Sequence, residues 1–478
     1  MSRSTPKEDH TPSRFSPLSA LDSVYLTTET RDAPMHIACL VFLDAKPLLT
    51  RTGRLRTEAI HRHIERQWAK VESVHTRLKP QENERDPHSW EHVTDVRNCV
   101  DAIELPVQSD DRMVLDWCAT ALSPILPRDR PLWRIHLLAG LTRSRVGLLF
   151  QMHHSLCDGQ GAAALLSSLM DGPNEQASGE TEHESEMLEQ VGTSLTSRAT
   201  GVVHQLYDLA NKGVSAAKLG VDLADGVAFL ATSTRTRPQS SLNQTITPER
   251  RLDIASVEFD MVRETAHKLH VTLNDIILAM VTGALRTMLQ ERGEDVSELT
   301  LEALVPVSMR SPETTSESGN RTAVLQVPLP VWEENVHERL LRVHSSTNDR
   351  KKHHVAPAVS ILESAASFVP FALLQPISKL SVQHQNLVNI VITNLRGPTE
   401  PLSFMGARVR SVVPFLPLAP SLPISVAIGS YGSTLEIGVQ SNPQGCPEAP
   451  IFASNLLVEL AKIRKAAHRL VAKDEVHV

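Results

Sequence analysis

Two blocks of alternating strand and helix patterns, separated by a long polar stretch, constrain the fold more than any other feature of this chain. In the first block, apolar runs at 35–42, 133–138 and 146–152 predict strands, while amphipathic patterns at 55–76 and 110–122 predict helices. Strands that alternate with helices are typical of α/β and α+β proteins. We therefore expect a mixed sheet with flanking helices in this block.

The second block begins at residue 251 and repeats the alternation. A strand is expected at 255–259 and a helix at 262–269. Thr272 precedes a longer helix that is expected to end at Gly293, because threonine is a common N-cap residue and glycine often follows the last helical turn. Further strands are expected at 301–307, 323–328, 388–393, 407–413, 424–431 and 435–440.

The stretch between the blocks differs from both in composition. Residues 171–190 are acidic and poor in apolar residues, which predicts an exposed linker, and an amphipathic helical pattern follows at 200–232. A chain of 478 residues exceeds what one hydrophobic core usually serves. The expected organisation is an N-terminal domain at 1–172, with 1–16 disordered, a linker containing an amphipathic helix at 173–250, and a C-terminal domain at 251–478.

Charge and composition exclude several classes of partner and site. The formal net charge of −7 and the aromatic share of 4% argue against a nucleic-acid partner, which would need a basic surface and stacking side chains. The five cysteines are scattered and form no Cys-x-x-Cys pair, so neither a disulfide framework nor a structural zinc site is indicated. The polar N-terminus lacks the pattern of a signal peptide, and no apolar run reaches the roughly 18 residues of a membrane span. We therefore expect a cytoplasmic protein, with peripheral membrane contact left open.

The segment GLLFQMHHSLCDGQG at 147–161 places polar side chains where an expected strand ends. His153 and His154 follow the strand, Asp158 and Gly159 come next, and a helix is expected to begin near Gly161. Side chains at such a junction project from a rigid scaffold, where catalytic groups are often found. The two glycines allow positive φ or close backbone approach. Because strand side chains alternate in direction, the two histidines are expected to have different roles.

The residues of this segment alone leave three interpretations open. The histidines can form an acid–base pair, a structural pair or part of a metal site. His-His-x3-Asp is not a usual zinc spacing, and no HExxH sequence completes it, so a metal is not expected. Asp158 fits a helix N-cap or a buried ion pair better than a direct chemical role.

The residues from His153 to Gly159 match the HHxxxDG motif of CoA-dependent acyltransferases with the chloramphenicol acetyltransferase fold, which include nonribosomal peptide condensation domains and plant alcohol acyltransferases. Together with further segments, this motif resembles the bacterial wax ester synthase/diacylglycerol acyltransferase family across nearly the whole chain. The loop at 394–398 is a loose version of a family SNxPGP segment, and the plant DFGWG sequence is absent. The accompanying segments occur in family order at 19–22 followed by 34–36, 131–133, 274–275, 305–310 and 319–320.

The resemblance implies two chloramphenicol acetyltransferase-like domains with an active-site tunnel between them. It implies an enzyme, a diacylglycerol O-acyltransferase or long-chain-alcohol O-fatty-acyltransferase. Such an enzyme transfers a long-chain acyl group from acyl-CoA to diacylglycerol, giving triacylglycerol, or to a fatty alcohol, giving a wax ester. Acyl-CoA is then a co-substrate, and no bound cofactor is expected. A place in the cytoplasm, on the inner membrane or on lipid droplets would suit these substrates.

The resemblance also assigns roles to residues. His154 is the general base, because a histidine with a pKa of about 6.5 can take a proton from an alcohol near neutral pH. His153 is expected to orient it, and Asp158, beside Gly159, to fix the turn, with Arg310 as a candidate partner. Asn274 is either the donor to the oxyanion of the tetrahedral intermediate or the N-cap of its helix. The other motif residues are assigned to substrate binding: Pro131, Leu132, Trp133 and Asp275.

A covalent route and two rival functions are also open. No GxSxG elbow supports a serine nucleophile, whereas Cys157 lies three residues after His154 and could form a Cys–His dyad. That position is variable in the motif, so direct transfer in a ternary complex is preferred. The rival functions are a stand-alone condensation-type acyltransferase acting on a carrier-bound or polyketide alcohol, and a non-catalytic acyl-CoA- or lipid-binding protein. A binding protein needs no base, so the intact motif argues against the latter.

Two apolar segments broken by prolines occur in the second block, at 366–377 and 412–424. The first interpretation is buried core beside an irregular connection. The second is a lipid-facing lip or an acyl tunnel.

Overall fold

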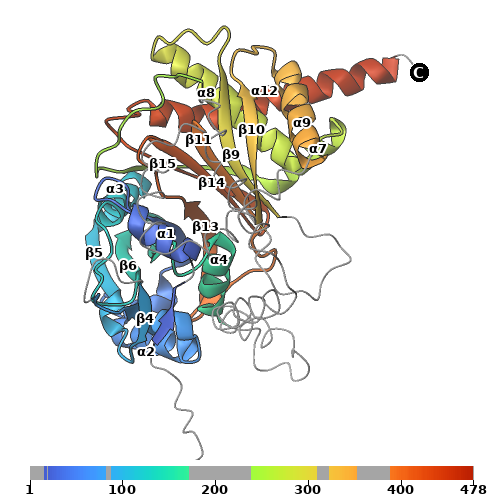
Figure 1. Cartoon of the computed structure of the whole chain (residues 1–478). Coiled ribbons are helices and arrows are strands. Elements are labelled where there is room, and N and C mark those ends of the chain that lie inside the picture. Colours follow the sequence, from blue (N-terminus) through green and yellow to red (C-terminus); the bar gives the residue numbers. More distant parts are fainter. Residues whose placement is uncertain are drawn as a thin grey trace, which may run out of the picture.

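The computed structural model describes residues 15–18, 20–81, 88–171, 238–308, 322–352 and 388–476. Within these ranges the strands form two six-stranded sheets and one three-stranded sheet. Figure 1 shows the first six-stranded sheet in the lower part of the molecule and the second in the upper part, each flanked by helices. The predicted class, α/β with mixed sheets and flanking helices in both halves, is therefore confirmed.

The first sheet has the strand order β12-β13-β2-β7-β6-β5. Its central strands pair antiparallel, whereas β5 and β6 pair in parallel. One face packs on α2 through Trp68 and Trp133, and the other is covered by α3, so the sheet separates two layers of buried side chains. The strands are β12 (Ser403–Phe404), β13 (Ala407–Phe415), β2 (His36–Asp44), β7 (Arg145–His153), β6 (Trp133–Leu141) and β5 (Val100–Ser109). The helices are α1 (Ala20–Thr28), α2 (Thr57–Trp68), α3 (Asp111–Leu122) and α4 (Gly159–Ser168), beside a small sheet of β1 (Phe15–Pro17), β4 (Ser89–His92) and β3 (Thr76–Leu78).

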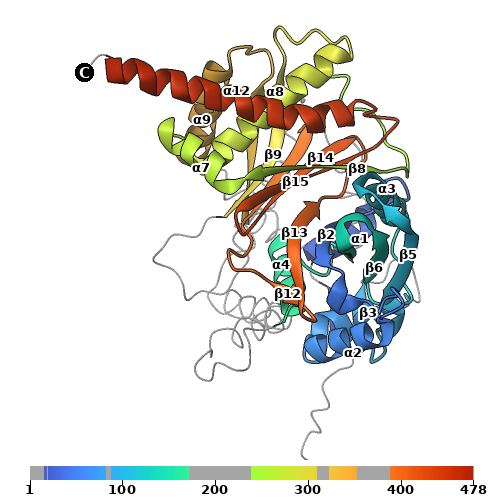
Figure 2. The same cartoon turned by 180° about the vertical axis from the view of Figure 1, so that it is seen from behind.

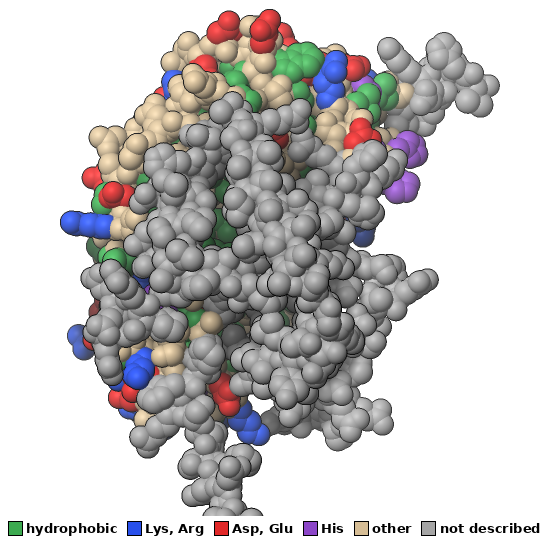
Figure 3. All heavy atoms as spheres, in the orientation of Figure 1, with side chains coloured by type: hydrophobic (Ala, Val, Ile, Leu, Met, Phe, Trp, Pro, Cys, Tyr) green, Lys and Arg blue, Asp and Glu red, His purple; other side chains and the backbone are tan. Residues whose placement is uncertain are grey.

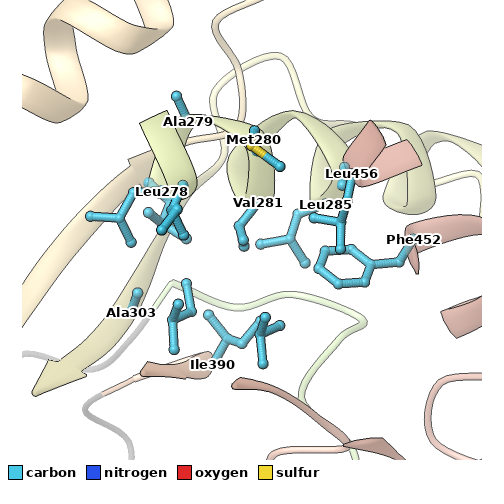
Figure 4. Close-up of a cluster of buried hydrophobic side chains, with 14 of the residues drawn as sticks. Leu278, Ala279, Met280, Val281, Leu285, Ala303, Ile390, Phe452 and Leu456 are labelled. Carbon is cyan, nitrogen blue, oxygen red and sulfur yellow. The ribbon is translucent and has the colours of Figure 1, made fainter. Parts of the chain in front are cut away.

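The second sheet has the strand order β10-β9-β11-β14-β15-β8. Helix α8 is almost wholly buried against it, and the long helix α12 crosses α8 on the outside (Figure 2). In Figure 4, Leu278 and Val281 of α8 lie above Ile390 of the sheet, and Phe452 of α12 closes the cluster at one side. The strands are β10 (Thr322–Pro330), β9 (Thr300–Ser308), β11 (Ile390–Leu395), β14 (Ile424–Tyr431), β15 (Thr434–Ser441) and β8 (Arg251–Glu258). The helices are α7 (Phe259–Lys268), α8 (Leu273–Glu291), α9 (Val336–Lys352) and α12 (Ala449–Val476).

Part of the second block belongs to the first sheet. Strand β13 pairs antiparallel with β2, and β12 pairs with β13. Asp171, just after α4, anchors this hairpin, because its carboxylate accepts hydrogen bonds from Ser403 Oγ (2.7 Å) and the Met405 N–H (2.9 Å). The predicted division into 1–172 and 251–478 misses this exchange, since pairing between distant strands leaves no local pattern in the sequence.

Most predicted elements are present with shifted ends. The strand expected at 146–152 is β7, and the strand expected at 424–431 is β14 with the same bounds. The helix expected at 55–76 ends at Trp68, where the chain turns before a short 3-10 helix, Glu72–His75. The elements that were not predicted are strands β1, β3, β4, β5 and β12 and helices α9 and α12.

The apolar segment at 412–424 lies within the described residues. Val413, Phe415, Leu418 and Leu422 are buried, which confirms the core interpretation of the segment at 412–424. The prediction of a disordered tail at 1–16 is wrong at its end, because Phe15 and Ser16 belong to β1 and pair with β4. Other predictions lie outside the described residues: the rest of that tail, the linker helix at 200–232, the apolar segment at 366–377 and the motif residues Ser19, Arg310, Gly319 and Asn320.

Taken singly, no helix in the described ranges is long and apolar enough to cross a membrane. Helices α7 and α8 reach the length and composition of a span only as a pair, and they are bent by 100° at the break between them. Figure 3 shows acidic, basic and hydrophobic side chains interspersed over the described part of the visible face.

Candidate active site

Strand β7 carries the predicted catalytic segment to the end of the first sheet. All of its residues are buried, and its last residue, His153, stands opposite His36 of β2. Asp158 is the N-cap of α4, because its Oδ1 accepts a hydrogen bond from the Gly161 N–H (2.9 Å). The helix therefore begins at Gly159, earlier than expected, and the N-cap interpretation of Asp158 is confirmed.

The glycines of this turn matter for space rather than for backbone conformation. Neither Gly159 nor Gly161 has a positive φ, so of the two expected reasons for glycine only close approach applies. A Cβ at Gly161 would lie 2.7 Å from Cys157 Cβ, which is too close for any larger residue. A Cβ at Gly159 would lie 3.4 Å from Leu395 Cδ1, at the end of β11. The turn therefore lies where the first sheet meets the second.

Two other motif segments hold the histidines through their backbone. The His153 N–H donates to the Leu132 carbonyl (2.8 Å), and the His154 N–H donates to the Met35 carbonyl (2.9 Å). Segments 34–36 and 131–133, which are far from the histidines in the sequence, thus meet them in the fold. Three of the quoted motif segments therefore meet at one place in the fold.

Pro131, Leu132 and Trp133 lie away from solvent, so their predicted role in substrate binding stays a prediction. All three are buried in the core of the first sheet, and Trp133 Nε1 donates to the Val74 carbonyl (2.9 Å). They position the end of β7.

His153 has a fixed tautomer. Its Nδ1 accepts a hydrogen bond from the Ser155 N–H (3.1 Å) and lies 2.7 Å from Ser155 Oγ. Because a backbone N–H can only donate, Nδ1 carries no proton and the ring proton is on Nε2. That Nε2 lies 3.4 Å from Glu29 Oε1. Nδ1 of His153 is therefore occupied, and its Nε2 faces a buried carboxylate without the geometry of a hydrogen bond. This arrangement supports an orienting role rather than proton abstraction.

Glu29, directly after α1, is the centre of a buried polar network that sequence reasoning missed. Its side chain is 1% exposed, pairs with Arg128 and accepts a hydrogen bond from the Met35 N–H (2.9 Å). Its Oε1 also lies 3.6 Å from His36 Nε2. In the sequence, Glu29 stands in the polar run TTETRDAP, where no spacing distinguishes it from Asp32.

Burial sets the charges of this network. Burial alone would raise the pKa of Glu29, but its interaction with the nearby His153 ring and the charge of Arg128 outweigh this, so the pKa lies below its usual value. Burial lowers the pKa of His153, with Glu29 opposing, and lowers the pKa of His36 to about 3. Near neutral pH the network therefore holds one carboxylate and two neutral imidazoles. Within the described residues, no group of His, Cys, Asp or Glu is placed to hold a metal ion.

His154 has a different environment from His153. Its ring stacks on Tyr25 of α1, with ring centroids 4.2 Å apart and planes at 14°, and the residue is only partly buried. Burial lowers its pKa, whereas its own main-chain carbonyl and Asp158 act in the opposite direction. A pKa below the usual value of about 6.5 leaves the ring neutral at pH 7, which is the form that accepts a proton. Of the two histidines, His154 therefore has the properties of a base.

Cys157 is poorly placed to act as a nucleophile. Its Sγ contacts Met152 Sδ (3.6 Å), and burial, with Asp158 and Asp22 adding to it, raises the pKa of the thiol. Because the thiolate is the reactive form, this environment disfavours attack on a thioester. The Cys–His dyad has no support here.

Asn274 and Asp275 lie in the first turn of α8. Thr272 is the N-cap, with its Oγ1 accepting from the Asp275 N–H (3.2 Å) while Asp275 Oδ2 accepts from the Thr272 N–H (2.9 Å). The N-cap interpretation of Asn274 is therefore wrong. Asp275 Oδ2 also lies 2.7 Å from His344 Nδ1, so this oxygen serves the helix and its neighbour α9, and the substrate-binding role of Asp275 stays a prediction. Asn274 Nδ2 is buried and has no hydrogen-bond partner in the described part of the chain.

The structure thus brings four of the predicted residues into one turn: His153, His154, Asp158 and Gly159. Among the described contacts none joins Asn274 to this turn, so its role as an oxyanion donor stays a prediction. Arg310, the candidate partner of Asp158, lies outside the described residues.

Two mixed sheets with a histidine turn at their junction define a two-domain acyltransferase fold. The wax ester synthase/diacylglycerol acyltransferase catalytic domain matches residues 18–277, and the WS/DGAT C-terminal domain matches residues 318–464. The chain belongs to the wax ester synthase/diacylglycerol acyltransferase family.

Individual relatives agree with this membership. The chain is 31% identical to the probable diacylglycerol O-acyltransferase tgs1 of Mycobacterium tuberculosis, over 77% of this chain and 80% of that one. It is 24% identical to the O-acyltransferase WSD of Acinetobacter baylyi, over 96% of this chain and 98% of that one. In fold it is similar to the wax ester synthase/diacylglycerol acyltransferase from Marinobacter aquaeolei VT8, with a TM-score of 0.67, 22% identity and coverage of 95% and 100%.

Proposed function

We propose that the protein is an O-acyltransferase that moves a long-chain acyl group from acyl-CoA to diacylglycerol or to a fatty alcohol, without a bound cofactor. The observation that carries this proposal is the contrast within the histidine pair. His154 is neutral and stacked on Tyr25, whereas His153 Nδ1 accepts a hydrogen bond from Ser155 and its Nε2 faces the buried Glu29 carboxylate at 3.4 Å. Relatives named diacylglycerol O-acyltransferase and O-acyltransferase support the same class of reaction.

In the proposed reaction His154 moves one proton twice. Its neutral ring takes the proton of the acceptor hydroxyl while the oxygen attacks the thioester carbonyl. The tetrahedral intermediate then collapses, the carbon–sulfur bond breaks, and the imidazolium returns the proton to the leaving CoA thiolate. The products are an ester and CoA-SH, and the enzyme ends in its starting state.

Asn274 is the proposed donor to the oxyanion of the intermediate. Its Nδ2 is a buried donor without a partner among the described residues, and it lies at the N-terminal end of α8. Helix N-termini favour negative charge, and a donor already held in place stabilises a developing oxyanion. Asn274→Ala is expected to lower kcat by about 10²-fold with little change in stability.

The test is turnover by the purified protein with palmitoyl-CoA and either diolein or hexadecanol. The wild type is expected to release CoA thiol and form the neutral lipid. His154→Ala should lower the rate by about 10²–10⁴-fold. His92→Ala is a matched control, because His92 is an exposed histidine on β4, and it should keep full activity. Full turnover by His154→Ala would remove this residue as the base, and turnover only of carrier-bound thioesters would favour a condensation-type enzyme.

We also propose that the protein works at a lipid surface, on the inner membrane or on lipid droplets. Each buried methylene of an acyl chain contributes about 0.8 kcal/mol, so diacylglycerol stays in a lipid phase. Flotation with vesicles that contain diolein should carry the protein upward. Recovery of all protein from the bottom fraction would contradict this placement.

A further inference from the structure

A cavity of about 370 Å³ lies on the face of the first sheet that carries His36 and His153. Strands β5, β6 and β7 form its floor, and the end of α3 and the loop at 124–127 form its walls. Its volume falls within the roughly 300–1,000 Å³ of typical small-molecule sites. His154 is not among the lining residues, so this cavity is separate from the reacting group.

Most of the cavity wall is apolar. Ile103 lies on the floor, Trp117 and Ala121 come from α3, and Ile125 and Leu126 come from the following loop. Helix α3 ends at Leu122, so beyond that point it no longer covers the sheet and the space stays open. These walls suit an aliphatic chain.

The remaining wall is polar but carries no net charge. The Arg134 guanidinium pairs with the Asp101 carboxylate at 2.9 Å. His136 is 7% exposed, and burial lowers its pKa to about 4, with Asp101 opposing, so its ring is neutral. His136 Nδ1 lies 3.1 Å from Asp101 Oδ2 without the geometry of a hydrogen bond. Arg134 Nε and His136 Nδ1 are buried and lack hydrogen-bond partners within the described residues.

We propose that this cavity binds a neutral aliphatic alcohol, with its hydroxyl group at Asp101, Arg134 and His136 and its chain along the apolar wall. A hydroxyl group can donate a hydrogen bond to the Asp101 carboxylate and accept one from the Arg134 guanidinium at the same time. An anionic head group would face Asp101, and a cationic one would face Arg134. Because the polar end is already neutral, neither would gain a net countercharge.

The cavity is connected to the catalytic network through His36. Gln151 lines the cavity, and its side-chain amide lies 2.9 Å from His36 Nδ1. Leu126 also lines it, and its N–H donates to His36 Nε2 (3.2 Å). Both ring nitrogens of His36 are therefore held by residues that a bound alcohol would contact. On β7, Gln151 and His153 are alternate residues on one face, about 7 Å apart.

Alcohol binding in this cavity is distinct from the proposed acyltransferase reaction, because it can be measured without any turnover. The test uses the full chain labelled with 5-fluorotryptophan, whose five tryptophan signals are followed by fluorine NMR. Trp117→Phe identifies the Trp117 signal. On titration with 1-octanol this signal is expected to shift saturably, at a concentration about tenfold lower than for octanoate or octylammonium. No shift with octanol, or an equal shift with octanoate, would overturn the proposal.

Three variants sharpen the test. Ala121→Phe fills the cavity and should weaken octanol binding by about tenfold or more. Thr120→Phe adds the same bulk at the neighbouring exposed position and should bind octanol as the wild type does. Asp101→Asn leaves the guanidinium charge uncompensated, so octanoate should bind at least as well as octanol. Unchanged binding by Ala121→Phe, or unchanged selectivity in Asp101→Asn, would overturn the proposal, and the other tryptophan signals report whether each variant is folded.

Discussion

The two sheets of this molecule bury different kinds of side chain. On its α3 face, the first sheet buries His36, Gln151 and His153 near the ionised Glu29. The second sheet buries a large apolar cluster under α8 and α12 (Figure 4), and its buried Arg339–Glu459 ion pair lies between α9 and α12, away from the histidine turn. Burial lowers the pKa values of His36 and His153 in the first region. In the second region, burial of apolar side chains stabilises the fold. Changes in the apolar cluster under α8 and α12 are therefore expected to affect mainly stability, and changes at Glu29 and His153 mainly activity.

A cavity in the second core should give the largest change in stability. Leu278 is fully buried in α8, and Leu278→Ala is expected to lower the free energy of unfolding by about 2–5 kcal/mol, through lost burial and the space left behind. Turnover per folded molecule should stay near the wild-type value below the unfolding temperature. Urea unfolding followed by circular dichroism measures the first quantity, and an activity assay on the same samples measures the second. A large loss of turnover in fully folded Leu278→Ala would break the separation between the two regions.

Removing the charge at Glu29 should lower activity more than it lowers stability. Glu29→Gln keeps the shape of the side chain but removes the carboxylate that faces His153 Nε2. We expect kcat to fall by about 10²-fold, equivalent to about 2.7 kcal/mol, because the His153 tautomer loses its partner. Asp32→Asn changes a nearby exposed carboxylate and serves as the control, with activity unchanged. Equal activity in Glu29→Gln and Asp32→Asn would show that the network does not serve the reaction.

Acid should destabilise the first region through its buried histidines. In the folded protein the pKa of His36 is about 3, whereas in the unfolded chain a histidine titrates near its usual value of about 6.5. Below about pH 6.5 the unfolded chain therefore binds a proton that the folded chain does not. Stability is full above that pH and falls by about 1.4 kcal/mol per pH unit for each such histidine as the pH decreases toward the folded pKa.

The measurement is urea unfolding at several pH values between about 7 and 5. His36→Gln should show a smaller slope of unfolding free energy against pH than the wild type. His92→Gln, at an exposed position, should keep the wild-type slope. Equal slopes in all three proteins would contradict the buried neutral state of His36.

The smallest effect is expected at Cys157. Its thiol pKa is raised by burial, and its Sγ contacts Met152 Sδ. Cys157→Ala should change kcat by less than about twofold, since the proposed reaction has no covalent intermediate. Trapping a labelled acyl group on Cys157 would overturn direct transfer.

Sequence patterns predicted elements better than pairings. The strands at 146–152 and 424–431 were predictable because apolar runs bounded by turn residues report local structure. The edge strand β5 was missed because most of its side chains are at least partly exposed and its apolar residues are interrupted by polar ones. The place of β13 in the first sheet depends on a partner in the other block, which no local pattern records.

The candidate site was likewise predictable in its local features but not in its contacts between distant segments. The alternation of side chains along β7 correctly separated His153 from His154. The role of Glu29 was not predictable, because it arises where Glu29, His36 and His153 converge in space from separate segments. The resemblance identified Pro131, Leu132 and Trp133 as a motif, but only the fold shows that they hold the turn from the core.

The central claim is that His154 takes the proton and His153 holds it in place, and imidazole rescue tests this directly. His154→Gly leaves a space beside Tyr25 in which free imidazole can replace the lost base. We predict that imidazole restores part of the turnover of His154→Gly, in proportion to its neutral form, and restores none in His153→Gly. Rescue of His153→Gly without rescue of His154→Gly would contradict the assignment.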